Sequence, residues 1–212
     1  MNILKPKETL LKDLIELEDL VENTKSIDII KNKIVQNIEN EKIELSNIEF
    51  ENIIFNNANI VNSILEKNTF NNVKFINCNF SNTSFEKCSF IRCEFSNCKV
   101  TGCNFIDARL YNITFNETNA NYINFSMASM ENILFTNIGL RNSYFQENRL
   151  KNVYLEKADL TQAHFSNTSL KNIDLSDSTI EGIVVSIEDI KGAIINEFQC
   201  MDLIYLLGIK IK

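Results

Sequence analysis

Residues 78–97 read CNFSN, TSFEK, CSFIR and CEFSN, which are four successive groups of five residues with one shared pattern. The first residue of each group is Cys or Thr, the third is always Phe, and the others are mostly polar. A period of five matches neither the 3.6-residue period of a helix nor the two-residue period of a strand. It predicts a chain that turns a corner every five residues, with the first and third residues of each group pointing inward.

The same register continues far beyond this stretch. From Leu45 to Ile190 it contains 30 central positions, and all 30 are apolar. Of the 15 phenylalanines in the chain, 14 occupy these positions, and the exception is Phe198. The regularity predicts a solenoid, in which each unit buries its apolar residues by stacking on its neighbours.

The pattern resembles the pentapeptide-repeat family, whose consensus is a small residue, Asp or Asn, Leu or Phe, Ser or Thr, and any residue. Clear matches are ADLTQ at 158–162, CNFSN at 78–82 and IDLSD at 173–177. The resemblance implies an all-β solenoid, a right-handed quadrilateral β-helix with four pentapeptides in each coil. The repeats then make about 7.5 coils, and a strand spacing of about 4.8 Å gives a rod roughly 36 Å long.

When central positions 20 residues apart are grouped into columns, residues of the same kind fall in the same column. This grouping supports four pentapeptides per coil independently. The four sides of the solenoid are named here after the first residue of each column, as the Phe50, Phe55, Ile60 and Leu65 sides. Two opposite sides are rich in rings, which we expect to stack and to add about 0.5–1.5 kcal/mol per pair beyond burial. The rings of the Phe55 side are Phe55, Phe75, Phe95, Phe115 and Phe135, and those of the Leu65 side are Phe85, Phe105, Phe125, Phe145 and Phe165.

The two ends depart from the repeat and divide the chain into three parts. We expect an N-terminal helical cap over residues 1–42, the β-helix over 43–192, and a C-terminal helix and tail over 193–212 that serves dimerisation. Within the cap, apolar residues at helical spacing predict one helix over 6–22 and a second over 27–38. The cap is expected to cover the exposed first coil, and binding of a partner is the alternative role.

The C-terminal part is apolar on more than one face. The segment from Glu197 to Leu207 predicts a helix that stops at Gly208. EGI at 181–183 and LLGI at 206–209 resemble the C-terminus of the quinolone-resistance pentapeptide-repeat proteins. That resemblance implies an end-to-end homodimer. The expected interface residues are Phe198, Met201, Leu203, Ile204, Leu206 and Leu207.

Chemically active groups are scarce. The single histidine, His164, falls at an outward position, and the five glycines form no phosphate-binding loop. Five of the six cysteines fall at inward positions, with spacings of five or ten that fit no zinc site. We expect them to be reduced, buried core residues, and we expect no enzyme activity, metal or cofactor. The cysteines are Cys78, Cys88, Cys93, Cys98, Cys103 and Cys200.

The overall charge and hydropathy exclude two classes of ligand. The net charge is −7, so direct binding of nucleic acid is not expected. No apolar run reaches the roughly 20 residues of a membrane span. The N-terminal sequence MNILKPKE lacks the apolar core of a cleavable signal, and we expect a cytoplasmic protein.

The resemblance to the quinolone-resistance proteins implies a function as well. It suggests a DNA mimic that binds DNA gyrase and topoisomerase IV and modulates or protects them. The Phe55 side is the most acidic, since five carboxylates stand against Lys74 and Lys157, a net charge of −3. The expected partner-binding residues on this acidic face are Glu94, Glu117, Glu156, Asp174 and Asp177.

Two other interpretations stay open. In the first, the solenoid is a scaffold for a different protein, bound through a basic strip on the Phe50 side, where six basic residues oppose four acidic ones. Rows of Asn on the flat sides offer a further surface, at Asn52, Asn72, Asn112, Asn132, Asn152 and Asn172. In the second, the solenoid has a structural role without a defined partner.

Overall fold

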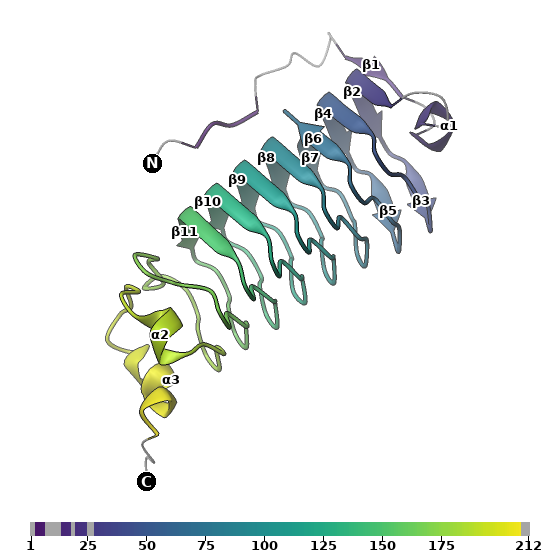
Figure 1. The fold of residues 1–212 in the computed structure, drawn as a ribbon. Helices are drawn as coiled ribbons and strands as arrows, with labels where there is room; N and C mark the ends of the chain where they lie inside the picture. The colour runs from purple at the N-terminus through teal and green to yellow at the C-terminus, as the bar shows by residue number, and fades with distance from the viewer. Residues whose placement is uncertain (1–2, 7–13, 18–19, 25–27, 209–212) are drawn as a thin grey trace.

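The structure is a computed structural model that describes residues 3–6, 14–17, 20–24 and 28–208. It is a parallel β-solenoid of about seven turns, drawn as a rod of stacked coils in Figure 1. The prediction of a four-sided β-solenoid is therefore confirmed.

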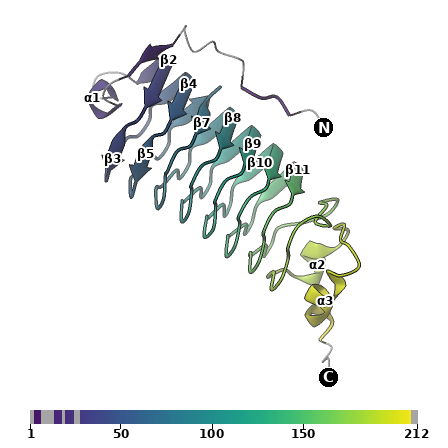
Figure 2. The same ribbon diagram turned by 180° about the vertical axis from the view of Figure 1, so that it is seen from behind.

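One long strand in most coils runs over the Phe50 and Phe55 sides. Successive strands pair in parallel with a shift of 20 residues, so that Phe95 lies beside Phe115 and Phe115 beside Phe135. Figure 2 shows the same stack from behind. The strands are β2 (Ile29–Gln36), β4 (Glu49–Asn56), β8 (Ser89–Ser96), β9 (Arg109–Asn116), β10 (Ser129–Thr136) and β11 (Arg149–Glu156), and one coil is split into β6 (Thr69–Asn71) and β7 (Lys74–Ile76).

The other two sides are held by shorter contacts. On the Ile60 side, β3 (Glu39–Glu41) pairs in parallel with β5 (Asn59–Val61). Further along, single parallel bridges join consecutive coils, such as Asn79 to Lys99 on the Ile60 side and Asn104 to Asn124 on the Leu65 side.

Left-handed backbone residues form nearly all of the corners. In the described part of the chain, 28 non-glycine residues have positive φ, all of them two positions after a central residue, and 17 are Asn. Asn tolerates this conformation better than most residues with a side chain. The abundance of Asn and the shortage of Gly in the sequence are thus explained by the turns.

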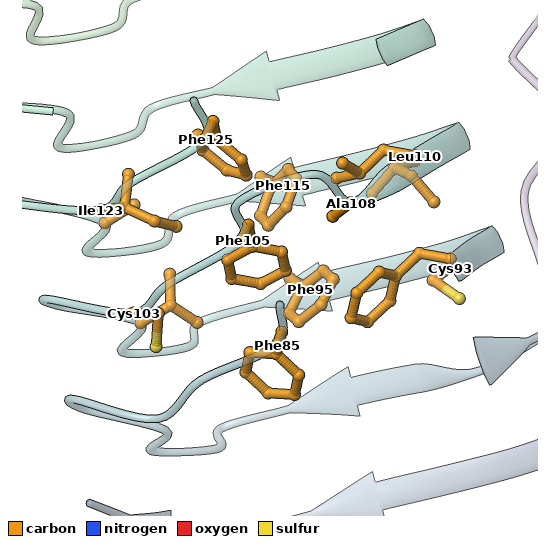
Figure 3. Close-up of a cluster of buried hydrophobic side chains, with 14 of the residues drawn as sticks. Phe85, Cys93, Phe95, Cys103, Phe105, Ala108, Leu110, Phe115, Ile123 and Phe125 are labelled. Carbon is orange, nitrogen blue, oxygen red and sulfur yellow. The ribbon is translucent and has the colours of Figure 1, made fainter. Parts of the chain in front are cut away.

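The interior is filled by stacked rings. Phe95 lies between Phe75 and Phe115, with centroid distances of 4.4 and 4.6 Å and interplanar angles of 15° and 10°. Neighbouring sides meet edge to face, as for Phe75 and Phe80 at 5.5 Å and 86°. Figure 3 shows the rings from two sides meeting along the axis. The predicted columns of rings are therefore confirmed.

The small inward residues do more than fill space. Their hydroxyl or thiol groups donate hydrogen bonds to backbone carbonyls of the coil before. Cys88 donates to the Leu65 carbonyl at 2.8 Å, and Thr83 donates to the Ile60 carbonyl at 2.9 Å. All six cysteines are free thiols.

The N-terminal part is mostly not helical. The predicted helix over 27–38 is wrong, because Ile29–Gln36 forms strand β2, which pairs in parallel with β4. Ile30 and Val35 already belong to the five-residue register and are buried, but Asn40 interrupts the register and obscures it in the sequence. The parallel stacking therefore begins before residue 43.

The predicted helix over 6–22 is wrong where the structure describes it before Leu20. Ile15–Glu16 forms strand β1, which pairs with β2, and Leu20–Thr24 forms the short helix α1. Residues 7–13 lie outside the described part of the chain. The backbone of β2 explains the outcome, since its free edge offers hydrogen bonds to any extended segment.

Residues 3–6 lie far from α1, beside the middle of the rod (Figure 1). The backbone N–H of Leu4 donates a hydrogen bond to the side-chain oxygen of Asn112 at 3.3 Å, and Pro6 is buried. This contact joins residues 108 positions apart.

The C-terminus carries short helices, as predicted, but they are shorter than expected. They are α2 (Ile187–Ile190), α3 (Cys200–Leu203) and the 3-10 helix Ile204–Leu207, which ends at Gly208 with φ 67°. Gln199 closes the end of the solenoid by donating to the carbonyls of Leu175 and Ser178 at 2.8 and 2.7 Å. Within the described residues, no helix is long and apolar enough to cross a membrane.

Candidate functional site

The predicted acidic face is divided along the rod. Glu156, Asp174 and Asp177 gather at the C-terminal end and line one groove. Glu94 and Glu117 lie on earlier coils, and the coil that contains Phe135 separates them from the other three. The structure therefore brings together three of the five predicted residues.

Local hydrogen bonds fix two of these carboxylates. Ser176 donates to Asp174 from its hydroxyl at 2.6 Å and from its backbone N–H at 2.9 Å. These bonds hold the pKa of the Asp174 carboxyl below its usual value. Glu94 accepts a hydrogen bond from the Ser96 hydroxyl at 2.9 Å. Asp174 thus stays charged over a wide pH range.

The basic strip on the Phe50 side is partly neutralised and partly covered. Lys151 forms an ion pair with Glu131 at 2.7 Å, and Lys31 forms one with Glu51. In the middle of the strip, residues 3–6 lie against Asn112, which is only 1% exposed. The exposed basic groups therefore concentrate towards the C-terminal end, at Arg149, Lys151, Lys171 and Lys191.

The rows of Asn bond along the rod. Asn52 donates to Asn32 at 3.0 Å, and Asn152 donates to Asn132 at 2.9 Å. Four such bonds join amides 20 residues apart in this column. These Asn residues form the left-handed turns at the corners and hydrogen-bond to one another along the rod, which is the ordinary structural role of such ladders.

The predicted dimer residues differ in exposure. Phe198, Met201 and Leu207 are 79%, 59% and 67% exposed. Leu203 and Leu206 instead pack partly against the solenoid core, and Ile204 is half-buried. The predicted interface omits three further apolar residues at this end that are about half exposed, Ile187, Ile194 and Tyr205.

A groove opens in the solenoid beside β11. It has a volume of about 600 Å³ and lies between β11 and the segment that follows one coil later. Core residues form its floor, because Val153 and Leu155 are 6% and 8% exposed, whereas Ile133 and Phe135 one coil earlier are 0% and 1%. The lining residues are Leu150, Lys151, Asn152, Val153, Tyr154, Leu155, Glu156, Lys171, Asn172, Ile173, Asp174 and Asp177.

The backbone ladder is broken across this groove. In an earlier coil, the N–H of Asn72 donates to the Ile91 carbonyl at 2.9 Å. The equivalent bond from Asn152 to Lys171 is absent. The structure describes every residue from 148 to 178, and none of the equivalent ladder bonds joins β11 to the next coil there. The missing backbone bonds include those from Ser169 to Asn148, Asn152 to Lys171, Asp174 to Val153 and Lys157 to Ser176.

The same two coils stay closed on the opposite sides. Leu160 donates to the Thr179 carbonyl and Phe165 donates to the Val184 carbonyl, both at 2.8 Å. Residues 170–175 bond instead to the C-terminal segment, for example through the N–H of Leu170 and the carbonyl of Asp189 at 2.8 Å. The groove therefore opens between β11 and a coil that remains hydrogen-bonded to residues 187–208, the C-terminal cap.

Several buried thiols have raised pKa values, and the single histidine stacks on a tyrosine. Burial raises the pKa of the Cys88, Cys93 and Cys103 thiols to about 12. His164 stacks on Tyr144 with a centroid distance of 4.9 Å. Across the described residues there is no group of three or more His, Cys, Asp or Glu that could hold a metal ion.

Two family models match adjacent parts of the chain. The model for the pentapeptide repeat region matches residues 68–143, and the model for pentapeptide repeats in eight copies matches residues 140–179. Together they cover residues 68–179, which is 112 of 212 residues. The chain is a pentapeptide-repeat protein. The predicted family is therefore confirmed.

Solved structures of pentapeptide-repeat proteins are similar to this one. A trypsin-treated form of QnrB1, a plasmid-mediated fluoroquinolone resistance protein, is 19% identical with a TM-score of 0.40, covering 87% of this chain and 90% of its own. HetL, a pentapeptide-repeat protein of Nostoc involved in heterocyst differentiation regulation, is 13% identical with a TM-score of 0.42, covering 81% and 93%. None of the curated proteins matches the chain.

Proposed function

We propose that this pentapeptide-repeat protein is a non-catalytic dimer that modulates or protects a type II topoisomerase, DNA gyrase in the first instance, by mimicking DNA. The supporting observation is the cluster formed by Glu156, Asp174 and Asp177 close to the exposed apolar C-terminus. Carboxylates in this position present negative charge to a surface that normally binds phosphates.

The C-terminal end supports the dimer. Phe198, Met201 and Leu207 project apolar surface that a monomer would leave in water. A two-fold interface at this end would place two acidic clusters near one another across the axis. The paired clusters would extend the row of negative charge beyond the length of one rod.

The protein's effect on gyrase can be measured in a supercoiling assay with and without ciprofloxacin. We expect micromolar protein to restore supercoiling in the presence of the drug or to inhibit the enzyme directly. The variant E156K/D174K/D177K should lose the effect. The matched control E66K/E86K/D107K carries the same charge change on the opposite, Leu65 side and should retain it.

The dimer has its own test. Sedimentation at micromolar concentration should give a dimer for the natural chain and a monomer for the variant F198E/M201E. A monomeric natural chain would remove the dimer from the proposal. An absence of both protection and inhibition, in a chain that is dimeric, would remove the topoisomerase.

A second candidate function is a scaffold for another protein. The observation in its favour is the group of exposed basic residues at the C-terminal end of the Phe50 side, which fits an acidic protein partner. A pull-down that compares the natural chain with R149E/K191E tests it. Loss of captured acidic proteins, with an unchanged gyrase result, would favour the scaffold.

A further inference from the structure

We propose that the groove beside β11 binds an extended peptide segment of a partner protein, which adds as a parallel strand to the free edge of β11. This site does not depend on the topoisomerase proposal, and it is a different kind of recognition from DNA mimicry. Three features of the groove carry it: an unpaired backbone edge, an apolar floor and a division of charge along its length.

The backbone edge supplies the main attraction. Every strand of the sheet between β1 and β11 pairs on both edges, but β11 pairs only with β10. In earlier coils the groups equivalent to the N–H of Asn152 and Lys157 donate to the next coil, as Asn72 and Asn77 do at 2.9 and 3.0 Å. An open row of such donors and acceptors is a template for an added strand.

The floor supplies alternate apolar contacts. Val153, Leu155 and Ile173 are core residues that reach the groove, and each is 6–8% exposed. Side chains alternate between the two faces of a strand, so every second residue of a bound peptide would point towards this floor. The bound segment should therefore carry apolar or Thr residues at alternate positions.

The charges at the two ends of the groove differ in sign. Lys151 and Lys171 line the end on the Phe50 side, where β11 begins. Glu156, Asp174 and Asp177 line the end on the Phe55 side, where β11 finishes. A peptide parallel to β11 would thus need acidic residues in its N-terminal half and basic residues in its C-terminal half.

The length of the strand sets the length of the ligand. β11 has eight residues, so a bound segment of about eight or nine residues would use the whole edge. All strand pairs of the sheet are parallel, and a parallel peptide continues that pattern from β11. The order of charges along the peptide then becomes the determinant of specificity.

Two fluorescein-labelled peptides of identical composition test this order. The acid-first peptide is ETEVTIKTK and the base-first peptide is KTKVTIETE. Fluorescence anisotropy with the full chain should give a Kd about tenfold lower for the acid-first peptide. Equal affinities, or no binding of either peptide at millimolar protein, would overturn the proposal.

Charge reversal in the groove should weaken the preference. The variant K171E/D174K changes the charges at the two ends from +2 and −3 to 0 and −1, so it should bind the two peptides with nearly equal affinity. The milder variant K171Q/D174N, which keeps the turn around Ser176, leaves +1 and −2 and should retain part of the preference. The matched control R109E/E117K makes the same reversal on the same two sides of a closed coil and should behave like the natural chain.

Hydrogen exchange locates the bound peptide. Saturation with the acid-first peptide should slow exchange of the Asn152 and Lys157 amides and leave those of Asn112 and Glu117 unchanged. Binding without this protection would place the peptide elsewhere and refute the site. A loss of binding as the protein dimerises would show that a second copy fills the groove, which also contradicts the proposal. Neither result depends on activity towards gyrase.

Discussion

The middle of the solenoid and its C-terminal end follow the same repeat but pack differently. Between residues 69 and 136, successive coils bond on all four sides and the Phe55 side is a continuous stack of rings. Between residues 149 and 177, the coils bond on two sides and separate on the other two. A regular repeat is therefore compatible with an irregular rod.

The ring columns show one difference between the two regions. On the Leu65 side, Phe145 and Phe165 stack at 4.7 Å with an angle of 3°, and that side stays closed. On the Phe55 side the rings end at Phe135, and Leu155 and Leu175 follow. The Phe50 side changes to aliphatic residues at Leu110 without opening, so loss of rings alone does not open the groove. The coil after β11 also bonds to the C-terminal cap, which the middle coils do not.

Alkaline pH should separate the two regions most strongly. The buried thiols Cys88, Cys93 and Cys103 lie in the middle, and each has a pKa of about 12 against 9.0 when unfolded. The folded state keeps these protons while the unfolded state loses them, so stability is full below pH 9 and falls as the pH rises towards 12. The three thiols together should cost about 4 kcal/mol per pH unit in that window.

Urea unfolding at several pH values between 8 and 11 measures this slope. The variant C88A/C93A/C103A should lose most of the pH dependence, whatever its stability at pH 7. A slope that is the same in both proteins would show that these thiols are accessible to solvent.

Removal of one ring should cost more in the middle than removal of one Leu at the open end. Phe95→Ala deletes a side chain that is 0% exposed and stacked on both faces, and we expect a loss of about 3–5 kcal/mol. Leu155→Ala deletes a side chain at the groove floor, and we expect about 2 kcal/mol, because solvent already reaches the site. Chemical denaturation checks the difference. Equal losses would indicate that the groove is closed in solution.

Amide exchange should differ between equivalent backbone positions. The N–H groups of Asn132 and Asn137 lie in closed coils, and that of Asn137 donates to the Glu156 carbonyl at 2.9 Å. The N–H groups of Asn152 and Lys157 have no backbone acceptor among the described residues of the next coil and should exchange roughly a hundredfold faster. Hydrogen exchange with fragment mass spectrometry measures the ratio. Similar protection at all four positions would contradict the broken ladder.

The smallest effect concerns the inward hydroxyl groups. Thr83 is 0% exposed and donates to the Ile60 carbonyl, so Thr83→Val should cost about 1 kcal/mol by leaving that acceptor without a donor. Ser178 makes a longer bond of 3.5 Å to the Leu155 carbonyl beside the groove. Ser178→Ala should cost less than half as much. Thermal unfolding of the two variants provides the comparison.

Much of the fold could be predicted because every pentapeptide repeats the same pattern of inward apolar residues and polar turn residues. The N-terminal error shows where this fails. Ile30 and Ile34 have helical spacing, whereas Ile30 and Val35 have the spacing of the repeat, and only the edge of β4 selects the strand. The contact of Leu4 with Asn112 had no signal in the sequence, since a backbone N–H carries no residue-type pattern.

The candidate sites were less predictable than the fold. The charges of each side can be counted from the register, and the acidic character of the Phe55 side follows from that count. The gathering of Glu156, Asp174 and Asp177 around a groove cannot be counted in this way, because it depends on two coils that separate. The five-residue register continues without interruption from residue 148 to residue 178, so the sequence contains no sign of the groove.

The sequence by itself determined the period, the inward residues, the stacking of rings 20 positions apart and the use of Asn at the corners. These properties are local or repeat between neighbouring coils, so each pentapeptide specifies them through its own apolar and turn residues. Only the tertiary structure decided that β2 is a strand, that residues 3–6 lie against the rod, and that the ladder breaks after β11. These features depend on competition between distant backbone groups for hydrogen bonds, and side-chain patterns do not encode the outcome of that competition.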